Sequence, residues 1–176
     1  EVQPALTIQV ESVDYRYPEY TGLAPRSAER QGDIRALEGT QITVHASASH
    51  PIGRAAIEIN CDPRFGVPMT ADGKAAHGEF ALAMNGEDRN RPQQDSYQLR
   101  FTDEEGRENR RPTRYRIDVI RDEPPEVRLV NPPADNAQVP LDGSVELQVR
   151  AEDRDFALRR VALRLEREGK SLPVPA

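Results

Sequence analysis

The sequence has no tryptophan, a single cysteine and few aromatic residues, and each shortage carries information. Its 176 residues include five Tyr and four Phe, 36% of them are hydrophobic and 31% are charged. The mean hydropathy is −0.75. This small apolar share suits thin β layers better than the large core of an enzyme. Cys61 cannot form an internal disulfide, so it says nothing about the redox compartment.

Long hydrophobic runs are also absent. No stretch approaches the roughly 20 apolar residues of a membrane span, so we expect no membrane insertion by this chain. No signal peptide is present either. The chain starts with Glu1 and ends on LPVPA in an unfinished pattern, which favours a piece of a longer protein.

Net positive charge is lacking as well. The formal net charge is −6 and the isoelectric point is near 5.2, which argues against a nucleic-acid partner. Lys74 and Lys170 are the only lysines among 24 basic residues. Such a bias toward Arg fits a GC-rich coding genome better than a set of recognition sites.

What the sequence does have is a hydrophobic period of two, the pattern of half-buried strands. The parity of this pattern reverses at Ser12, which predicts a bulge or a strand that changes sheets. Six or seven short strands separated by turn residues predict an all-β fold, an Ig-like or fibronectin type III-like β-sandwich over residues 1–122. The expected inward residues are Leu6, Ile8, Val10, Val13, Tyr15, Tyr17, Ile42, Val44, Ala46, Ala48, Ala55, Ile57, Ile59, Cys61, Phe80, Leu82, Met84, Tyr97, Leu99, Phe101, Tyr115, Ile117 and Val119.

The stretch DSYQLRFTDEEG (95–106) has the spacing of a sandwich corner. In many sandwiches a Tyr near the start of the sixth strand donates a hydrogen bond to the backbone a few residues upstream. Tyr97 fits this role, with Leu99 where antibody domains have a Cys. The alternative is an inward Tyr on an ordinary strand, and either role is structural.

A proline-rich run, RDEPPEV (121–127), predicts the domain boundary because prolines end strand pairing and stiffen a linker. The alternating pattern restarts after it, so residues 123–176 are expected to form a partial second Ig-like module, strands A–C of a repeat. EGTQITVHA (38–46) matches DGSVELQVRA (142–151), and Gly39 lies 104 positions before Gly143. This spacing is typical of tandem modules of about 100 residues.

The segment YPEYTGLAPRSAERQGDIRALEGTQITVHASASHPIGRA (17–55) resembles a pattern found in large bacterial proteins of unknown function, of planctomycete and proteobacterial type. FTDEEGRENRRPTRYRIDVIRDEPPEV (101–127) is similar to the last hairpin and exit linker of bacterial Ig-like repeats. The resemblance implies extracytoplasmic modules of a membrane-anchored parent, and it carries over no catalytic residues. The matching positions are Pro18, Tyr20, Thr21, Gly22, Gly32, Ile34, Ala36, Gly39 and Thr40.

Candidate metal ligands are few. His45, His50, His77 and Cys61 are the only soft ligands, and their spacing does not predict convergence on zinc. Asp153 and Asp155 have the spacing of calcium ligands, but no full loop motif surrounds them, so we favour a polar turn. We therefore expect no metal and no cofactor.

Candidate binding residues form two groups. Tyr17 and Tyr20 could stack on a sugar or a peptide, or they could simply cover the core. Arg107, Arg110, Arg111 and Arg114 could bind an anionic polymer. Acidic residues interleave with this arginine cluster, which favours a salt-bridged sheet surface.

No catalytic motif is present: the sequence has no G-x-S-x-G, no H-E-x-x-H and no phosphate-binding glycine loop. We therefore expect a non-catalytic extracytoplasmic spacer or protein-interaction module, with a module that binds glycan or cell-wall polymer as the alternative. A surface of coplanar exposed tyrosines would favour the alternative, and tyrosines packed into the core would favour the spacer.

The second segment should carry a bare apolar face. A two- or three-stranded sheet with such a face is marginal in water, so something should cover it. The cover would be the first domain or, as the stiff Pro124–Pro125 linker favours, the same segment of a second chain in a homodimer through 123–176. The face comprises Val127, Leu129, Val145, Leu147, Val149, Val161, Leu163 and Leu165.

Overall fold

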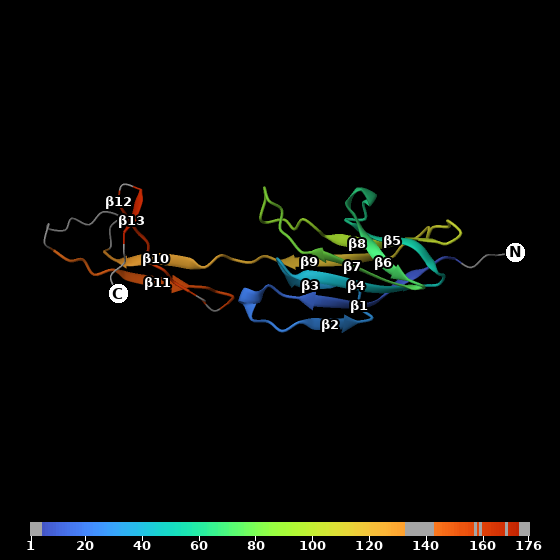
Figure 1. Ribbon diagram of the computed structural model, residues 1–176, viewed down its shortest axis with the longest axis horizontal. Helices are drawn as coiled ribbons and strands as arrows, with labels where there is room; N and C mark the ends of the chain where they lie inside the picture. Colours follow the sequence, from blue (N-terminus) through green and yellow to red (C-terminus); the bar gives the residue numbers. More distant parts are fainter. Residues whose placement is uncertain (1–4, 133–142, 157, 159, 168, 173–176) are drawn as a thin grey trace. The chain divides into compact units, whose positions relative to one another are not determined.

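The structure, a computed structural model, describes residues 5–132, 143–156, 158, 160–167 and 169–172 (Figure 1). The chain divides into two compact units, residues 1–122 and 123–176. Strands dominate both units, and the helical residues of the described part form only two short 3₁₀ turns, η1 (Glu19–Thr21) and η2 (Pro63–Phe65). The all-β class predicted from the period of two is confirmed.

The first unit is built on one nine-stranded sheet in the order β2-β1-β4-β7-β6-β5-β8-β9-β3. Strand β6 pairs with both β5 and β7, so it joins two halves that a sandwich would keep apart. Both halves contribute to a single core, which means that the sheet curls over on itself. The strands are β1 (Ile8–Arg16), β2 (Arg26–Glu29), β3 (Ile34–Leu37), β4 (Gln41–Ala48), β5 (Ile52–Ile59), β6 (Gly66–Asp72), β7 (Ala75–Ala81), β8 (Ser96–Asp103) and β9 (Arg114–Ile120).

The core follows the alternation in the sequence, because successive side chains of a strand point to opposite faces. Most of the expected inward residues are buried, and Val13, Ile42 and Ile57 are completely so. The parity change at Ser12 is confirmed as a register shift between Val10 and Ser12 in the pairing of β1 with β4. Four of the expected inward residues are only partly buried, namely Leu6, Tyr17, Cys61 and Tyr115.

Cys61 is therefore not the core residue that the sequence predicts. Strand β5 ends at Ile59, and Asn60 and Cys61 both adopt positive φ, at 55° and 56°, in a tight turn. The turn is closed by a hydrogen bond from the Asp62 amide to the Ile59 carbonyl, 3.1 Å long. It moves Cys61 off the buried face of β5, and its thiol lies 3.9 Å from the Ser96 hydroxyl.

Tyr97 is completely buried, but it does not pin a local corner as the sandwich pattern predicts. Its hydroxyl donates to the carbonyl of Gly32, 65 residues upstream, over 2.6 Å. Burial raises the pKa of this hydroxyl, so it remains a donor. The Tyr97 ring also stacks on Tyr115, with ring centroids 5.1 Å apart. Tyr97 therefore anchors the connection between β2 and β3.

That connection carries the chain from one half of the sheet to the other. Strand β2 is antiparallel to β1 at one edge, whereas β3 is parallel to β9 at the other. Gly32 lies in between, and a Cβ there would stand 2.2 Å from two ring carbons of Tyr115. Next to it, the Asp33 carboxylate accepts a hydrogen bond from the Arg116 amide over 2.8 Å. Only glycine fits beneath the Tyr115 ring.

The second unit contains two separate strand pairs rather than one three-stranded sheet. Strand β10 (Glu126–Asn131) pairs with β11 (Gln148–Glu152), and β12 (Leu165–Arg167) pairs with β13 (Lys170–Leu172). The sequence predicts longer strands, but 143–147 and 160–164 lie outside any strand. Val127 faces Ala151 and Leu129 faces Val149, so the expected apolar face does form across the first pair.

Most of this apolar face is exposed to solvent. The exposed fractions of Val127, Leu129 and Val149 are 60%, 49% and 43%, and Val145, Leu147, Val161 and Leu163 are exposed as well. The prediction that a partner covers the face stays a prediction.

Candidate functional site

The turn after β1 holds the point where the chain leaves the first unit. Tyr20 lies in η1, and its hydroxyl donates to the Asp122 carboxylate over 2.7 Å. The Thr21 hydroxyl donates to the Pro18 carbonyl over 2.7 Å, which fixes the turn itself. Gly22 ends the turn in the left-handed region, at φ 65°, where glycine has no steric cost. The exit residue Asp122 is thus tied to a rigid turn more than 100 positions earlier.

The end of β3 reinforces this exit from a second direction. The Glu38 amide donates to the carbonyl of Ile120, the last residue of β9, over 2.8 Å. Gly39, at φ 82°, turns the chain and donates its own amide to the Leu82 carbonyl. The residues that carry the bacterial resemblance therefore surround the exit, and their contacts are structural.

The chain enters and leaves the first unit at opposite ends. At the start of β1, Ile8 pairs with Ala48, whereas at its end Arg16 pairs with Gln41, next to the turn that holds Asp122. A nine-residue strand such as β1 spans about 25–30 Å. Figure 1 shows the N-terminal segment at one end of the sheet and the chain leaving β9 at the other.

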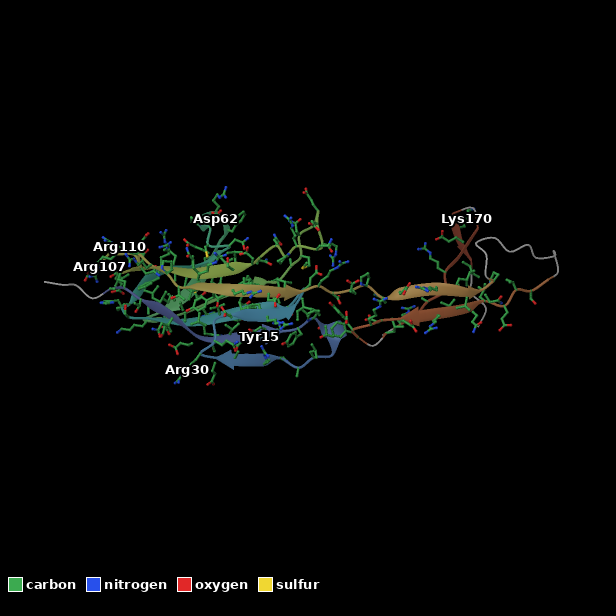
Figure 2. All side chains as sticks on the ribbon, turned by 180° about the vertical axis from the view of Figure 1, so that it is seen from behind. Tyr15, Arg30, Asp62, Arg107, Arg110 and Lys170 are labelled. Atoms are coloured by element: carbon green, nitrogen blue, oxygen red, sulfur yellow. The ribbon has the colours of Figure 1, made fainter. Side chains whose placement is uncertain are left out.

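A groove of about 880 Å³ lies at the end where the chain enters. It is lined by Leu6, Thr7, Arg107, Glu108, Arg110 and Arg111, among others. Figure 2 shows Arg107 and Arg110 together at this end. Three of the four arginines singled out in the sequence therefore share one hollow.

Asp103 and Asn109 fix the loop that carries these arginines, and the sequence analysis missed both residues. The side-chain amide of Asn109 donates to the Leu99 carbonyl over 2.8 Å and accepts from the Phe101 amide over 2.9 Å. Asn109 thus supplies hydrogen bonds that a neighbouring strand would otherwise give to β8. An Asn eight positions after a predicted strand is too weak a signal to reveal this role.

The Asp103 carboxylate, buried at the end of β8, accepts from the backbone amides of Glu105 and Arg107. It also forms an ion pair with the Arg107 guanidinium at 2.8 Å. Burial by itself raises the pKa of Asp103, but the hydrogen bonds from Arg107 and Glu105 outweigh it and hold that pKa below its ordinary value. Arg107 is thus occupied by Asp103, and Arg110 and Arg111 are the exposed charges of the groove.

The two predicted groups of binding residues do not form one surface. The arginine groove lies at the end where the chain enters, whereas Tyr17 and Tyr20 lie at the exit. Arg114 stands apart from the groove and pairs with Asp95 at 3.6 Å. Tyr17 packs against the core, and of the two tyrosines only Tyr20 is strongly exposed. The row of coplanar exposed tyrosines that would indicate a stacking platform is not found among the described residues.

The four soft ligands are split between two regions. His45 and His77 face each other on neighbouring strands, with ring centroids 6.0 Å apart. His50 lies in the turn after β4, and Cys61 follows β5. Asp153 accepts from the amides of Asp155 and Phe156, as in an ordinary polar turn. Within the described residues, no group of three or more His, Cys, Asp or Glu side chains is arranged to hold a metal ion.

Neither models of known protein families nor the curated proteins give a match to this chain. In the described part of the chain, no helix is both long and apolar enough to span a membrane.

Proposed function

We propose that this chain is a non-catalytic spacer or protein-interaction module, extracytoplasmic in location, of a larger membrane-anchored bacterial protein. One observation carries the proposal: the chain enters the first unit at one end and leaves at the other, and hydrogen bonds hold its exit. Modules joined in series need this arrangement, because it keeps the direction of the chain from one module to the next. The prolines at 124 and 125 follow the exit and stiffen the connection.

We also propose that the first unit is Ig-like. Two observations support this: the parallel pairing of β3 with the last strand β9, and a single core between the two halves of the curled sheet. In this interpretation β6 is a bridging strand at the rim of the sandwich.

Hydrogen exchange of a Tyr20→Phe variant tests the held exit. This change removes the donor to Asp122 and keeps the ring. A typical hydrogen bond contributes about 0.5–1.5 kcal/mol, so we expect roughly 2- to 10-fold faster exchange of the Glu38 amide, which bonds Ile120. Tyr17→Phe is the matched control, because the Tyr17 hydroxyl has no hydrogen bond to a described residue. Equal exchange in both variants would contradict a role of Tyr20 in holding the exit.

Binding and activity assays test the rest of the proposal. The purified chain should not co-sediment with peptidoglycan or with an anionic polysaccharide, and it should not hydrolyse ester, glycan or peptide substrates. Retention that is lost in Arg110→Ser, but kept in Arg16→Ser at the opposite end, would favour the alternative of a polymer-binding module. Hydrolysis that a single substitution abolishes would contradict the non-catalytic assignment.

For the second unit we propose the homodimer. The exposed apolar face across β10 and β11 supports it, because apolar side chains gain about 25 cal/mol per Å² on leaving water. The opposite face of the same strands is internally paired, Arg128 with Glu126 and Arg150 with Glu152. A partner with a strong net charge would therefore gain little there, and a second copy of the apolar face is the better match.

A further inference from the structure

Two histidines stand directly opposite each other on the outer face of the first unit. His45 on β4 pairs with His77 on β7, and their ring planes are only 28° apart. Directly opposite residues of an antiparallel pair have Cβ atoms about 4.5–5.5 Å apart, close enough for both side chains to reach one small ligand. His77 has no hydrogen bond to a described residue, so both of its ring nitrogens are available.

A hollow of about 280 Å³ lies beside this pair. Both histidines line it, together with the carboxylate residues Glu11 and Asp72. Ser47 and Thr70 supply hydroxyls at its wall, and the Ser47 hydroxyl donates to Glu11 over 2.6 Å. The hollow thus combines two imidazoles with two carboxylates, the donor set that divalent transition metals accept.

Asp14 orients His45 from the other side. Its carboxylate lies 2.9 Å from Nε2 of His45. A hydrogen bond with Ser27, partly opposed by burial, and the contact with His45 hold the pKa of Asp14 below its ordinary value. An ionised Asp14 accepts the Nε2 proton of a neutral His45, which leaves Nδ1 as the free lone pair. The carboxylate–histidine pair is the usual support of a metal-bound imidazole.

We propose that His45 and His77 bind a divalent transition-metal ion of the zinc class in this hollow. A zinc ion lies about 2.0–2.1 Å from an imidazole nitrogen, which places it about 3 Å from the ring centroid. Two rings with centroids 6.0 Å apart can therefore share one ion after a small rotation. Since no third ligand of the described residues is arranged around that position, the ion keeps bound water. Asp72 or Glu11 then neutralises its charge from the wall of the hollow.

Titration of the whole, tag-free chain tests the site. With ZnCl₂ at pH 7.5, calorimetry should give one ion per chain, and Cu²⁺ should bind more tightly than Zn²⁺. At an ion concentration ten times the Kd, the folding equilibrium constant should rise about 11-fold in thermal or chemical unfolding. His77→Ala should remove both effects, and its exposed position on the sheet makes loss of folding easy to exclude by circular dichroism.

Three comparisons decide the outcome. His50→Ala is the matched control, because His50 lies in a turn and contacts the Ser49 hydroxyl instead. Asp14→Asn should weaken zinc binding about 10- to 100-fold and leave the stoichiometry unchanged. Absence of zinc binding at millimolar concentration, equal loss in His50→Ala, or equally tight binding of Mg²⁺ would overturn the proposal. Tight Mg²⁺ binding would mean that carboxylates, not imidazoles, hold the ion.

Discussion

Replacing Gly32 with Ala should destabilise the first unit through one steric contact. The added Cβ would meet Cδ1 and Cε1 of Tyr115 at 2.2 Å, far inside contact distance. Tyr115 cannot move away freely, because its ring stacks on the buried Tyr97. Overpacking of this kind costs about 1–3 kcal/mol. The same shift would disturb the Gly32 carbonyl that accepts from the Tyr97 hydroxyl.

Urea unfolding followed by tyrosine fluorescence measures this cost. All five tyrosines lie within residues 1–122 and the chain has no tryptophan, so the signal reports only on the first unit. Gly86→Ala is the control, because no atom lies within 4 Å of a Cβ at Gly86. We expect the Gly86 variant to lie within about 0.5 kcal/mol of the parent.

A second substitution identifies the origin of the loss. In a Tyr115→Leu background the smaller side chain removes the clash, so Gly32→Ala should cost less there, with a coupling energy of about 1 kcal/mol or more. If Gly32→Ala costs no more than Gly86→Ala, or if its cost is the same without the Tyr115 ring, the steric argument is wrong.

Three further predictions concern other residues. Asp103→Asn should lower stability at pH 7, and its difference from the parent should shrink as the pH falls through about 4: the folded pKa of Asp103 is depressed, so its contribution is present above the unfolded pKa and lost below the folded one, as acid unfolding monitored by circular dichroism will show. Thr40→Val should raise the free energy of unfolding by about 1–2 kcal/mol, because the fully buried Thr40 hydroxyl has no partner among the described residues; a loss of stability in urea would contradict this. Leu129→Glu should abolish a concentration-dependent dimer in analytical ultracentrifugation, whereas Val130→Glu, next to it in β10, should not; a monomeric parent protein would refute the dimer.

The buried faces of the long strands could be predicted from the sequence, and the short strands could not. Alternation predicts the core wherever one face of a strand is buried, as along β4 and β8. Strand β2 is a polar edge of four residues and shows no alternation, and β6 buries only Met69 and contains Pro68. Strand β3 has four residues, three of them buried, too few to define a period. These three strands close the curled sheet at its edges and across its rim.

The candidate sites depended on pairing between strands, which a single sequence does not contain. The outward position of His45 follows from the alternation in β4, but its position opposite His77 follows from the register with β7. The partner of the Tyr97 hydroxyl likewise lies 65 positions away, on a connection that no local pattern defines. Arg107 was expected to pair with interleaved glutamates, and its shortest ion pair is instead with the buried Asp103.

The second unit shows why alternation predicts a face more reliably than it predicts a strand. In β4 the alternating residues are buried, because the strand has neighbours on both sides and an opposing half of the sheet across the core. The same pattern before β11 leaves Val145 and Leu147 exposed and outside any strand. A two-stranded ribbon without a cover is marginal, so nothing in the described unit favours extending it. Covering the apolar face should therefore lengthen β11 toward Val145, and hydrogen exchange should show new protection of the amides of 145–147 as the dimer forms.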